Sequence, residues 1–331
     1  MTNPGDLSGA AGKALLYVHG RNFKPSAENL MDLSVSALSC GVERDYPDYF
    51  DDFSKLPKRI AYYGDISDDF LTSQGERYDE ALDMGDRRNA LNALRGYGRR
   101  KHFGVARYDR LPGKTAITEF AADVFAPLLD RLGLSEALIR RVGIDLAEYW
   151  NPDSDFGARI RERVRLALCS ALDSGDRLMV ISHGTGCIVT YDVLWQLSHD
   201  DRFKDQYGES KIDLWLTMGA PLGDSMVFKR LMGAKEEGVR KFPVNVVSWH
   251  NMSAEDDFVS HDNTLADDFK QMLQHRQVSC IRDYRVYNLA VRYGKSNPQA
   301  SLGYLAHPRA AQVIVEWMQQ APVDTMPISI F

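Results

Sequence analysis

The segment RLMVISHGTGCIVTYDVLWQLS, residues 177–198, constrains the fold of this chain more than any other. Residues 177–182 form a short apolar run typical of a buried strand, and residues 187–198 have the length and apolar content of a helix. Gly184 and Gly186 lie between them, and glycine is the residue that a sharp backbone corner favours. The segment therefore predicts a strand, a tight turn and a helix, which together form the unit of a parallel sheet.

Most of the chain repeats this alternation. Short apolar runs rich in β-branched and aromatic residues predict further strands at 13–20, 58–65, 211–221, 244–251 and 283–291. Helical periodicity predicts helices over 155–175 and 307–320. Strands that alternate with helices indicate an α/β protein, in which helices cover both faces of a mostly parallel sheet.

Residues 66–150 do not follow this alternation. They contain several helical patterns, among them FAADVFAPLLDRLG and SEALIRRVGIDLAEYW, and no convincing strand. An insertion of this size between two strands is expected to lie over the carboxyl ends of the strands. The sequence therefore predicts an α/β core formed by residues 1–65 and 151–331, with a helical cap formed by residues 66–150.

Composition and charge restrict the class of partner. The 331 residues are 44% hydrophobic and 26% charged, as in an ordinary globular protein, and the net charge of −6 gives no basic face for nucleic acid. The most basic stretch, 95–107, is interpreted as a solvated loop, with phosphates or an anionic membrane as the alternative partner. The four cysteines have no metal-ligand spacing, so no metal or cofactor is expected.

The location of the protein is predicted from what the sequence lacks. The first residues contain no apolar segment of the kind found in secretory signals. No apolar run approaches the roughly 20 residues that a membrane helix needs. We therefore expect a cytoplasmic protein without a transmembrane segment.

Four motifs, in their chain order, resemble the α/β-hydrolase superfamily, in particular its lipases and esterases. LLYVHGRN (15–22) resembles the family's oxyanion loop after the third strand. SHGTGC (182–187) resembles the G-x-S-x-G nucleophile elbow after the fifth strand. WHNMSAEDDFVS (249–260) resembles the loop that carries the acid, and GYLAHP (303–308) resembles the loop that carries the catalytic histidine before the last helix.

The resemblance covers about 15–65 and 155–320 and implies an α/β-hydrolase fold with a catalytic triad. It places the nucleophile at Gly184, the acid at Asp257 and the base at His307, in the family's order. Asp256 is the alternative acid. In such a triad the histidine takes the proton of the serine, and the carboxylate fixes the imidazole tautomer.

The same resemblance implies an oxyanion hole and a pocket. The backbone N–H groups of Arg21 and Thr185 are expected to stabilise the developing oxyanion. His19, Gly20 and His183 are expected to line the pocket beside it, with His183 in a packing role and not as the base.

The nucleophile position is occupied by glycine, so the attacking atom is missing. Ser182, Thr185 and Cys187 are the neighbouring candidates for a substitute, but none is placed where a nucleophile must project. A water molecule activated by His307 is a third way in which catalysis could persist. Glycine adopts the strained corner conformation without steric penalty, which makes it a natural replacement once catalysis is lost.

These features predict a hydrolase of the ester or lipid acyl type that keeps an Asp–His pair and an oxyanion hole but is weakly active or inactive. The expected partner is a small-molecule ester or acyl ligand. The alternative is a catalytically dead pseudo-hydrolase that binds a small molecule or a protein in the same pocket.

Overall fold

The computed structural model describes residues 12–98, 100–113, 143–257 and 264–320. Six strands form one fully parallel sheet in the order β2-β1-β3-β4-β5-β6. The strands are β1 (Lys13–Val18), β2 (Lys58–Ala61), β3 (Arg177–His183), β4 (Ile212–Met218), β5 (Val246–Ala254) and β6 (Cys280–Val286). Each predicted strand overlaps one of them, and the predicted α/β fold with a mostly parallel sheet is confirmed.

Both faces of the sheet are buried, as expected for parallel strands between helices. In β1, Leu16 and Val18 belong to one apolar core, and Leu15 and Tyr17 belong to the other. Because successive side chains of a strand point to opposite faces, an uninterrupted apolar run supplies both cores. This explains why the strand runs in the sequence are continuous and do not alternate with polar residues.

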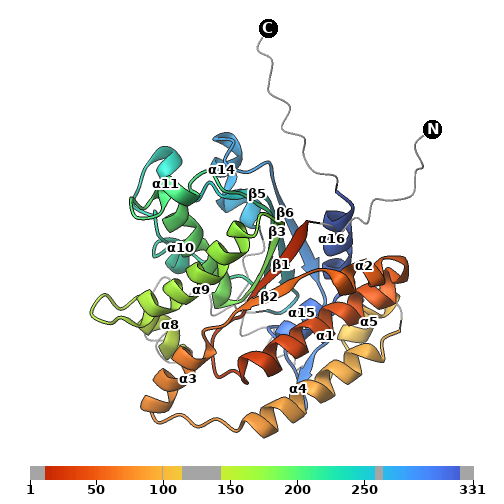
Figure 1. Ribbon diagram of the computed structural model, residues 1–331. Coiled ribbons are helices and arrows are strands. Elements are labelled where there is room, and N and C mark those ends of the chain that lie inside the picture. Colours follow the sequence, from red (N-terminus) through yellow and green to blue (C-terminus); the bar gives the residue numbers. More distant parts are fainter. Residues whose placement is uncertain (1–11, 99, 114–142, 258–263, 321–331) are drawn as a thin grey trace, which may run out of the picture.

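The two faces carry different helices (Figure 1). On one face, α9 (Phe156–Asp173) and α10 (Thr185–His199) pack against each other and against β1. On the other face, α1 (Ala27–Asp45) packs against α16 (Pro308–Gln319) and α15 (Ser301–Leu305).

Local sequence signals explain where two of these helices begin. The side chain of Ser26 accepts a hydrogen bond from Asn29 N and caps α1. Pro308 occupies the first turn of α16, where its missing N–H leaves no hydrogen bond unmade. The helix predicted at 307–320 is therefore confirmed as α16.

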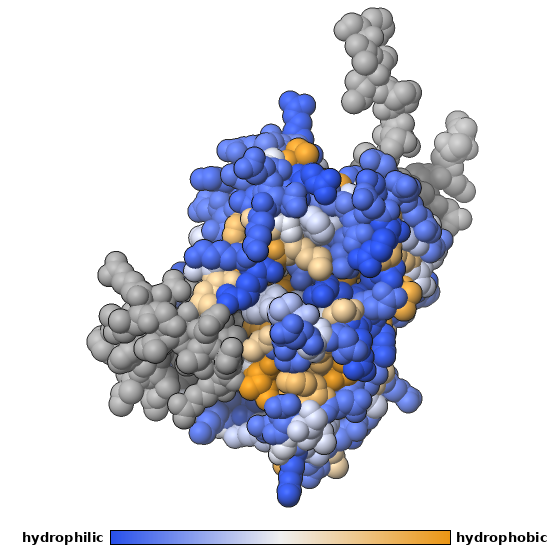
Figure 2. All heavy atoms as spheres, turned by 90° about the vertical axis from the view of Figure 1, so that its left-hand side faces the viewer, coloured by the Kyte–Doolittle hydropathy of each residue, from blue (hydrophilic) through white to orange (hydrophobic). Residues whose placement is uncertain are grey.

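Further elements complete the described part of the fold. They are α2 (Phe50–Lys55), α3 (Gly64–Ser73), α4 (Glu80–Arg95), α5 (Val105–Tyr108), α8 (Ile144–Tyr149), α11 (Lys204–Tyr207), α12 (Ser225–Phe228), α13 (Leu265–Asp268), α14 (Lys270–Gln274), the 3-10 helices Pro47–Tyr49, Arg100–His102 and Gly238–Lys241, and the hairpin of β7 (Val291–Arg292) and β8 (Lys295–Ser296). In the described ranges no helix is long and apolar enough to cross a membrane. Hydrophilic side chains cover most of the face in Figure 2, and apolar ones gather near its centre.

The described parts of residues 66–150 are helical and contain no strand. Two of them contact loops at the carboxyl ends of strands. Asp145 of α8 accepts a hydrogen bond from Asn22 N after β1, and Tyr108 of α5 donates one to Asp256 after β5. The pattern FAADVFAPLLDRLG lies outside the described residues, so the division into core and cap stays a prediction.

Gly186 allows α10 to pack closely against the end of β1. A Cβ atom at this position would lie 2.2 Å from the backbone oxygen of His19. Because a Cβ is fixed by the backbone of residue 186 and the atom that it meets is itself backbone, no change of rotamer can relieve the contact. The second glycine of the corner is therefore required by packing.

Replacing Gly186 by alanine should lower the free energy of unfolding by about 3 kcal/mol, because the added methyl group overpacks a backbone contact. Gly85→Ala in α4 is the matched control, since a Cβ there would meet nothing within 4 Å. That control should raise the free energy of unfolding by about 0.5–1 kcal/mol through helix propensity. Urea denaturation measures both, and equal effects would show that the close approach at Gly186 is not real.

Candidate functional site

The corner between β3 and α10 has the backbone conformation that the sequence predicts. Gly184 has φ 55° and ψ −127°, a combination that is essentially restricted to glycine unless the surroundings enforce it. Its N–H donates a hydrogen bond to Met218 O at 2.9 Å, which ties the corner to the end of β4. A Cβ at this position would lie 3.1 Å from the Gln299 side chain and 4.0 Å from Gly20 Cα. The empty nucleophile position therefore faces Gln299.

Asp257 lies on the far side of Gln299 from the corner. The carboxylate is only 3% exposed, and Tyr304 donates its hydroxyl proton to Oδ2 at 2.6 Å. With its amide nitrogen facing the carboxylate, Gln299 donates to both oxygens, to Oδ2 at 2.6 Å. This orientation of the amide follows from the hydrogen bonds that surround it. The Gln299 side chain therefore lies between the Gly184 corner and the Asp257 carboxylate.

Gly219 leaves the space in which these groups meet. It follows β4 with φ 56°, and a Cβ there would lie 3.0 Å from Asp257 Oδ2 and 3.2 Å from the Gln299 amide. The neighbouring acid, Asp256, accepts a hydrogen bond from Tyr108 at 2.8 Å. Of the two carboxylates that the sequence left open, it is thus Asp257 that contacts Gln299 beside the corner.

His307 does not contact either acid, so the expected Asp–His pair is wrong. It caps α16, and its Nδ1 accepts a hydrogen bond from Arg309 N at 3.0 Å. Its Nε2 is buried and has no hydrogen-bond partner in the part of the chain that the structure describes. The physical reason is that His307 follows α15 as the N-cap of α16, where its ring is bonded to the first turn of that helix. Burial, and then the charge of Arg44, lower the pKa of His307 to about 3.

The two histidines nearest the corner serve as hydrogen-bonding groups of the framework. His183, the last residue of β3, donates from Nε2 to the backbone oxygen of Gln299 at 2.8 Å, and burial lowers its pKa to about 4. His19 Nε2 accepts from Tyr63 N at 3.1 Å, and its Nδ1 donates to Gly20 O at 2.8 Å. Burial lowers the pKa of His19 to about 3, so both rings are neutral near pH 7. A Cβ at Gly20 would lie 3.1 Å from His183 Nδ1, which explains the glycine.

The neighbouring hydroxyl and thiol groups are not placed as nucleophiles. Ser182 is fully buried, and its Oγ accepts from Trp215 Nε1 at 2.8 Å and donates to Cys187 Sγ at 3.3 Å. Burial raises the pKa of the Cys187 thiol to about 12, so it stays protonated. Thr185 is the first residue of α10 and lines the pocket.

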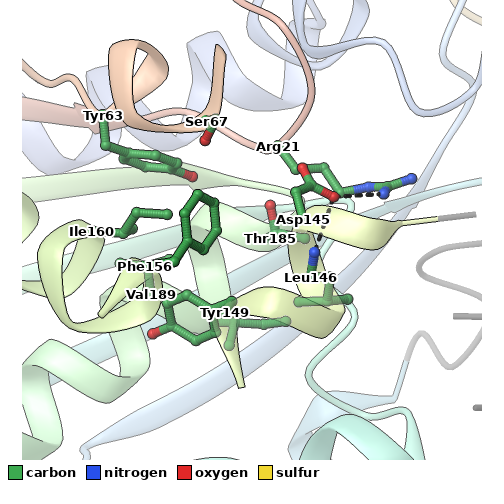
Figure 3. A pocket seen from close by; sticks show the side chains of 11 residues that line it. Arg21, Tyr63, Ser67, Asp145, Leu146, Tyr149, Phe156, Ile160, Thr185 and Val189 are labelled. Carbon is green, nitrogen blue, oxygen red and sulfur yellow. Dashed lines mark hydrogen bonds and ion pairs between the residues drawn. The ribbon is translucent and has the colours of Figure 1, made fainter. Parts of the chain in front are cut away.

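A pocket opens beside the corner, between α10 and α8 (Figure 3). Arg21 and Thr185, the two residues expected to form the oxyanion hole, both line it, so the structure brings them together. Its apolar lining comes from α8, α9 and α10 and consists of Leu146, Tyr149, Phe156, Ile160, Ile188 and Val189. Its free volume is about 20 Å³, enough for about one water molecule. The pocket is therefore small and mainly apolar.

No protein-family model, curated protein or solved structure matches this chain. The parallel sheet with a glycine corner after a central strand is compatible with the resemblance to α/β-hydrolases. Sequence reasoning missed Gln299 and Asp145. Glutamine is not a residue type that marks catalysis, and Asp145 lies in the predicted cap, where no motif singles it out.

The low pKa of buried His307 makes stability depend on pH in a defined direction. Its folded-state pKa of about 3 lies below the usual 6.5, so between these values the unfolded state binds more protons. The stabilisation is complete above about pH 6.5 and is lost as the pH falls towards 3. His307→Asn keeps an acceptor for Arg309 N but removes the titration.

We expect this variant to reduce the slope of unfolding free energy against pH, below pH 6.5, by up to about 1.4 kcal/mol per pH unit. Urea denaturation at a series of pH values measures the slope, relative to the same substitution at exposed His275. An unchanged slope in His307→Asn would contradict the burial of a neutral ring.

Proposed function

We propose that this protein binds a small, largely apolar ligand in the pocket beside Gly184 and does not hydrolyse it. The observation that carries the proposal is the row of Gly184, Gln299 and Asp257. In a hydrolase-like site these are the places of the attacking hydroxyl, the base and the acid. Here only the acid is of the required type.

Neither remaining position can perform its step. Glycine has no side chain, so no covalent intermediate can form at residue 184. The amide of Gln299 has no titratable proton acceptor at neutral pH, so it cannot take a proton from a hydroxyl or a water molecule. Removing the nucleophile or the histidine of a triad costs about 10⁶ in kcat, and only about 10³ over water remains from binding.

The surrounding groups do not compensate for this loss. His183 uses Nε2 to hold the Gln299 backbone. His19 uses Nε2 to hold Tyr63 N after β2 and Nδ1 to hold Gly20 O in its own loop. His307, the residue that could have activated a water molecule, caps α16. Asp257 holds Gln299 and Tyr304, which makes it a structural acid in this site.

The pocket itself supports binding. Small-molecule sites combine an apolar lining with a few convergent polar groups, and this pocket has both. Its polar side is formed by Arg21, Ser67, Asp145 and Thr185 at the ends of strands and helices. An acyl or other aliphatic group fits such a lining better than a sugar or a nucleotide, because most of the lining offers no hydrogen bond.

Hydrolysis of p-nitrophenyl esters of short and long acids tests the proposal. The wild-type chain, Gly184→Ser and Gln299→His should each show no turnover above the uncatalysed rate. Each of these proteins lacks a hydroxyl at residue 184, an imidazole at residue 299, or both. The double variant Gly184→Ser/Gln299→His is the only one expected to gain measurable turnover. Its stability should fall by about 1–3 kcal/mol, since serine must adopt the strained corner.

The control for the double variant is the same protein with Asp257→Asn, which should lose the gained activity. Turnover by the wild-type chain that Asp257→Asn abolishes would contradict a binding function. If the double variant folds but is inactive, only the backbone of the corner resembles a hydrolase, and the arrangement of the side chains does not.

A further inference from the structure

The loop after β1 holds a carboxylate that comes from α8. Arg21 Nη1 donates to Asp145 Oδ1 at 3.1 Å (Figure 3). Asn22 N donates to Asp145 Oδ2, also at 3.1 Å. The side chain of Asp145 is 4% exposed and that of Arg21 is 24% exposed. An acid of the predicted cap is thus buried against the loop that lines the pocket.

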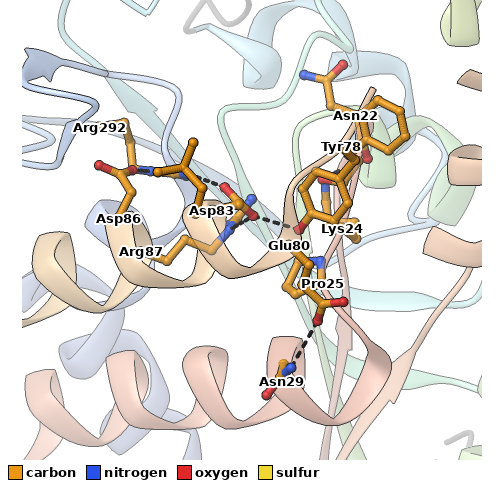
Figure 4. Close-up of polar contacts among 12 residues, drawn as sticks. Asn22, Lys24, Pro25, Asn29, Tyr78, Glu80, Asp83, Asp86, Arg87 and Arg292 are labelled. Carbon is orange, nitrogen blue, oxygen red and sulfur yellow. Dashed lines mark hydrogen bonds and ion pairs between the residues drawn. The ribbon is translucent and has the colours of Figure 1, made fainter. Parts of the chain in front are cut away.

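The loop is shaped to present donors to an anion. Asn22 has φ 68°, a left-handed conformation that turns its N–H towards Asp145. Lys24 Nζ donates to the backbone oxygens of Arg21, Asn22 and Phe23. Lys24 and Asn22 are both labelled in Figure 4. While these three oxygens accept from Lys24, the Asn22 N–H and the Arg21 guanidinium donate to Asp145, and such an arrangement of donors binds carboxylates well.

The same contact holds a helix that lines the pocket. Asp145 is at the start of α8, and Leu146 and Tyr149 of this helix line the pocket. At the far end of the helix, Tyr149 donates to buried Asp192 at 2.8 Å. The first turn of α8 is therefore held to the loop by Asp145, and the pocket beneath has room for only about one water molecule.

We propose that Asp145 is an internal competitor for an aliphatic carboxylate ligand. The ligand's carboxylate replaces that of Asp145 on Arg21 and Asn22 N, and its aliphatic chain enters the apolar space that α8 uncovers. This inference rests on the proposed binding function and names its ligand class. A carboxylate is favoured because the present occupant of the donors is itself a carboxylate.

Decanoate and decanol, which differ in head-group charge, are the probes. Titration calorimetry compares the wild-type chain with Asp145→Asn and Arg21→Met. Removing the competing carboxylate should tighten decanoate binding at least about tenfold. In Asp145→Asn the ligand no longer has to displace a charged side chain of the protein from Arg21 and Asn22 N before it can bind. Asp145→Asn should also increase the preference for decanoate over decanol, and Arg21→Met should abolish that preference.

Equal decanoate affinity in the wild-type chain and folded Asp145→Asn would overturn the inference. Equal binding of decanoate and decanol by all three proteins would also overturn it, while leaving the proposed binding function intact. No binding of either probe by any folded protein would count against both.

A second measurement covers the case in which Asp145→Asn does not fold. In the wild-type chain, decanoate should speed hydrogen exchange of the α8 amides more than the same concentration of decanol does, because only decanoate can take the place of Asp145 on Arg21 and Asn22 N. Unchanged exchange in α8 with decanoate bound would show that Asp145 is not displaced.

Discussion

The left-handed corner at Gly184 is the constraint on which the rest of the site depends. It turns the chain from the central strand β3 into α10, and its N–H is fixed to the end of β4. Because Gly186 then lies against the His19 backbone, the loop after β1 is brought next to the corner. Loops from β1, β3, β4 and β5 thereby meet at one edge of the sheet, where a parallel α/β fold commonly binds ligands.

The chemistry of this edge differs from what its backbone suggests. A hydrolytic site needs groups that gain or lose a proton during the reaction, whereas the described groups here are held in fixed hydrogen bonds. Asp257 is held by Tyr304 and Gln299, and His183 is held by the Gln299 backbone. In the described part of the chain, an ion pair between Arg21 and Asp145 adjoins the pocket and joins the loop after β1 to α8. Fixed hydrogen bonds around Gln299, together with a helix α8 that is joined to the loop after β1 through Asp145, fit the reversible binding proposed above.

The sequence predicted the parts of the structure that local patterns encode. Continuous apolar runs predicted all six strands, and the glycine corner predicted the conformation of residue 184. The base position could not be predicted in this way. No histidine occurs between His275 and His307, so the sequence pattern indicates His307, at the start of α16, and not Gln299. Only the fold shows that the chain passes the corner at residue 299 and that α15 follows before His307.

The side-chain amide of Gln299 gives the most direct test of this account. In a ¹H–¹⁵N spectrum its two protons are assigned by their loss in Gln299→Met, and the one that faces the buried carboxylate of Asp257 should exchange slowly with solvent. Asp257→Asn should speed that exchange and shift both resonances. Fast exchange of the amide in the wild-type chain, unaffected by Asp257→Asn, would contradict the assignment of Gln299 to the position beside Gly184 and with it the binding function.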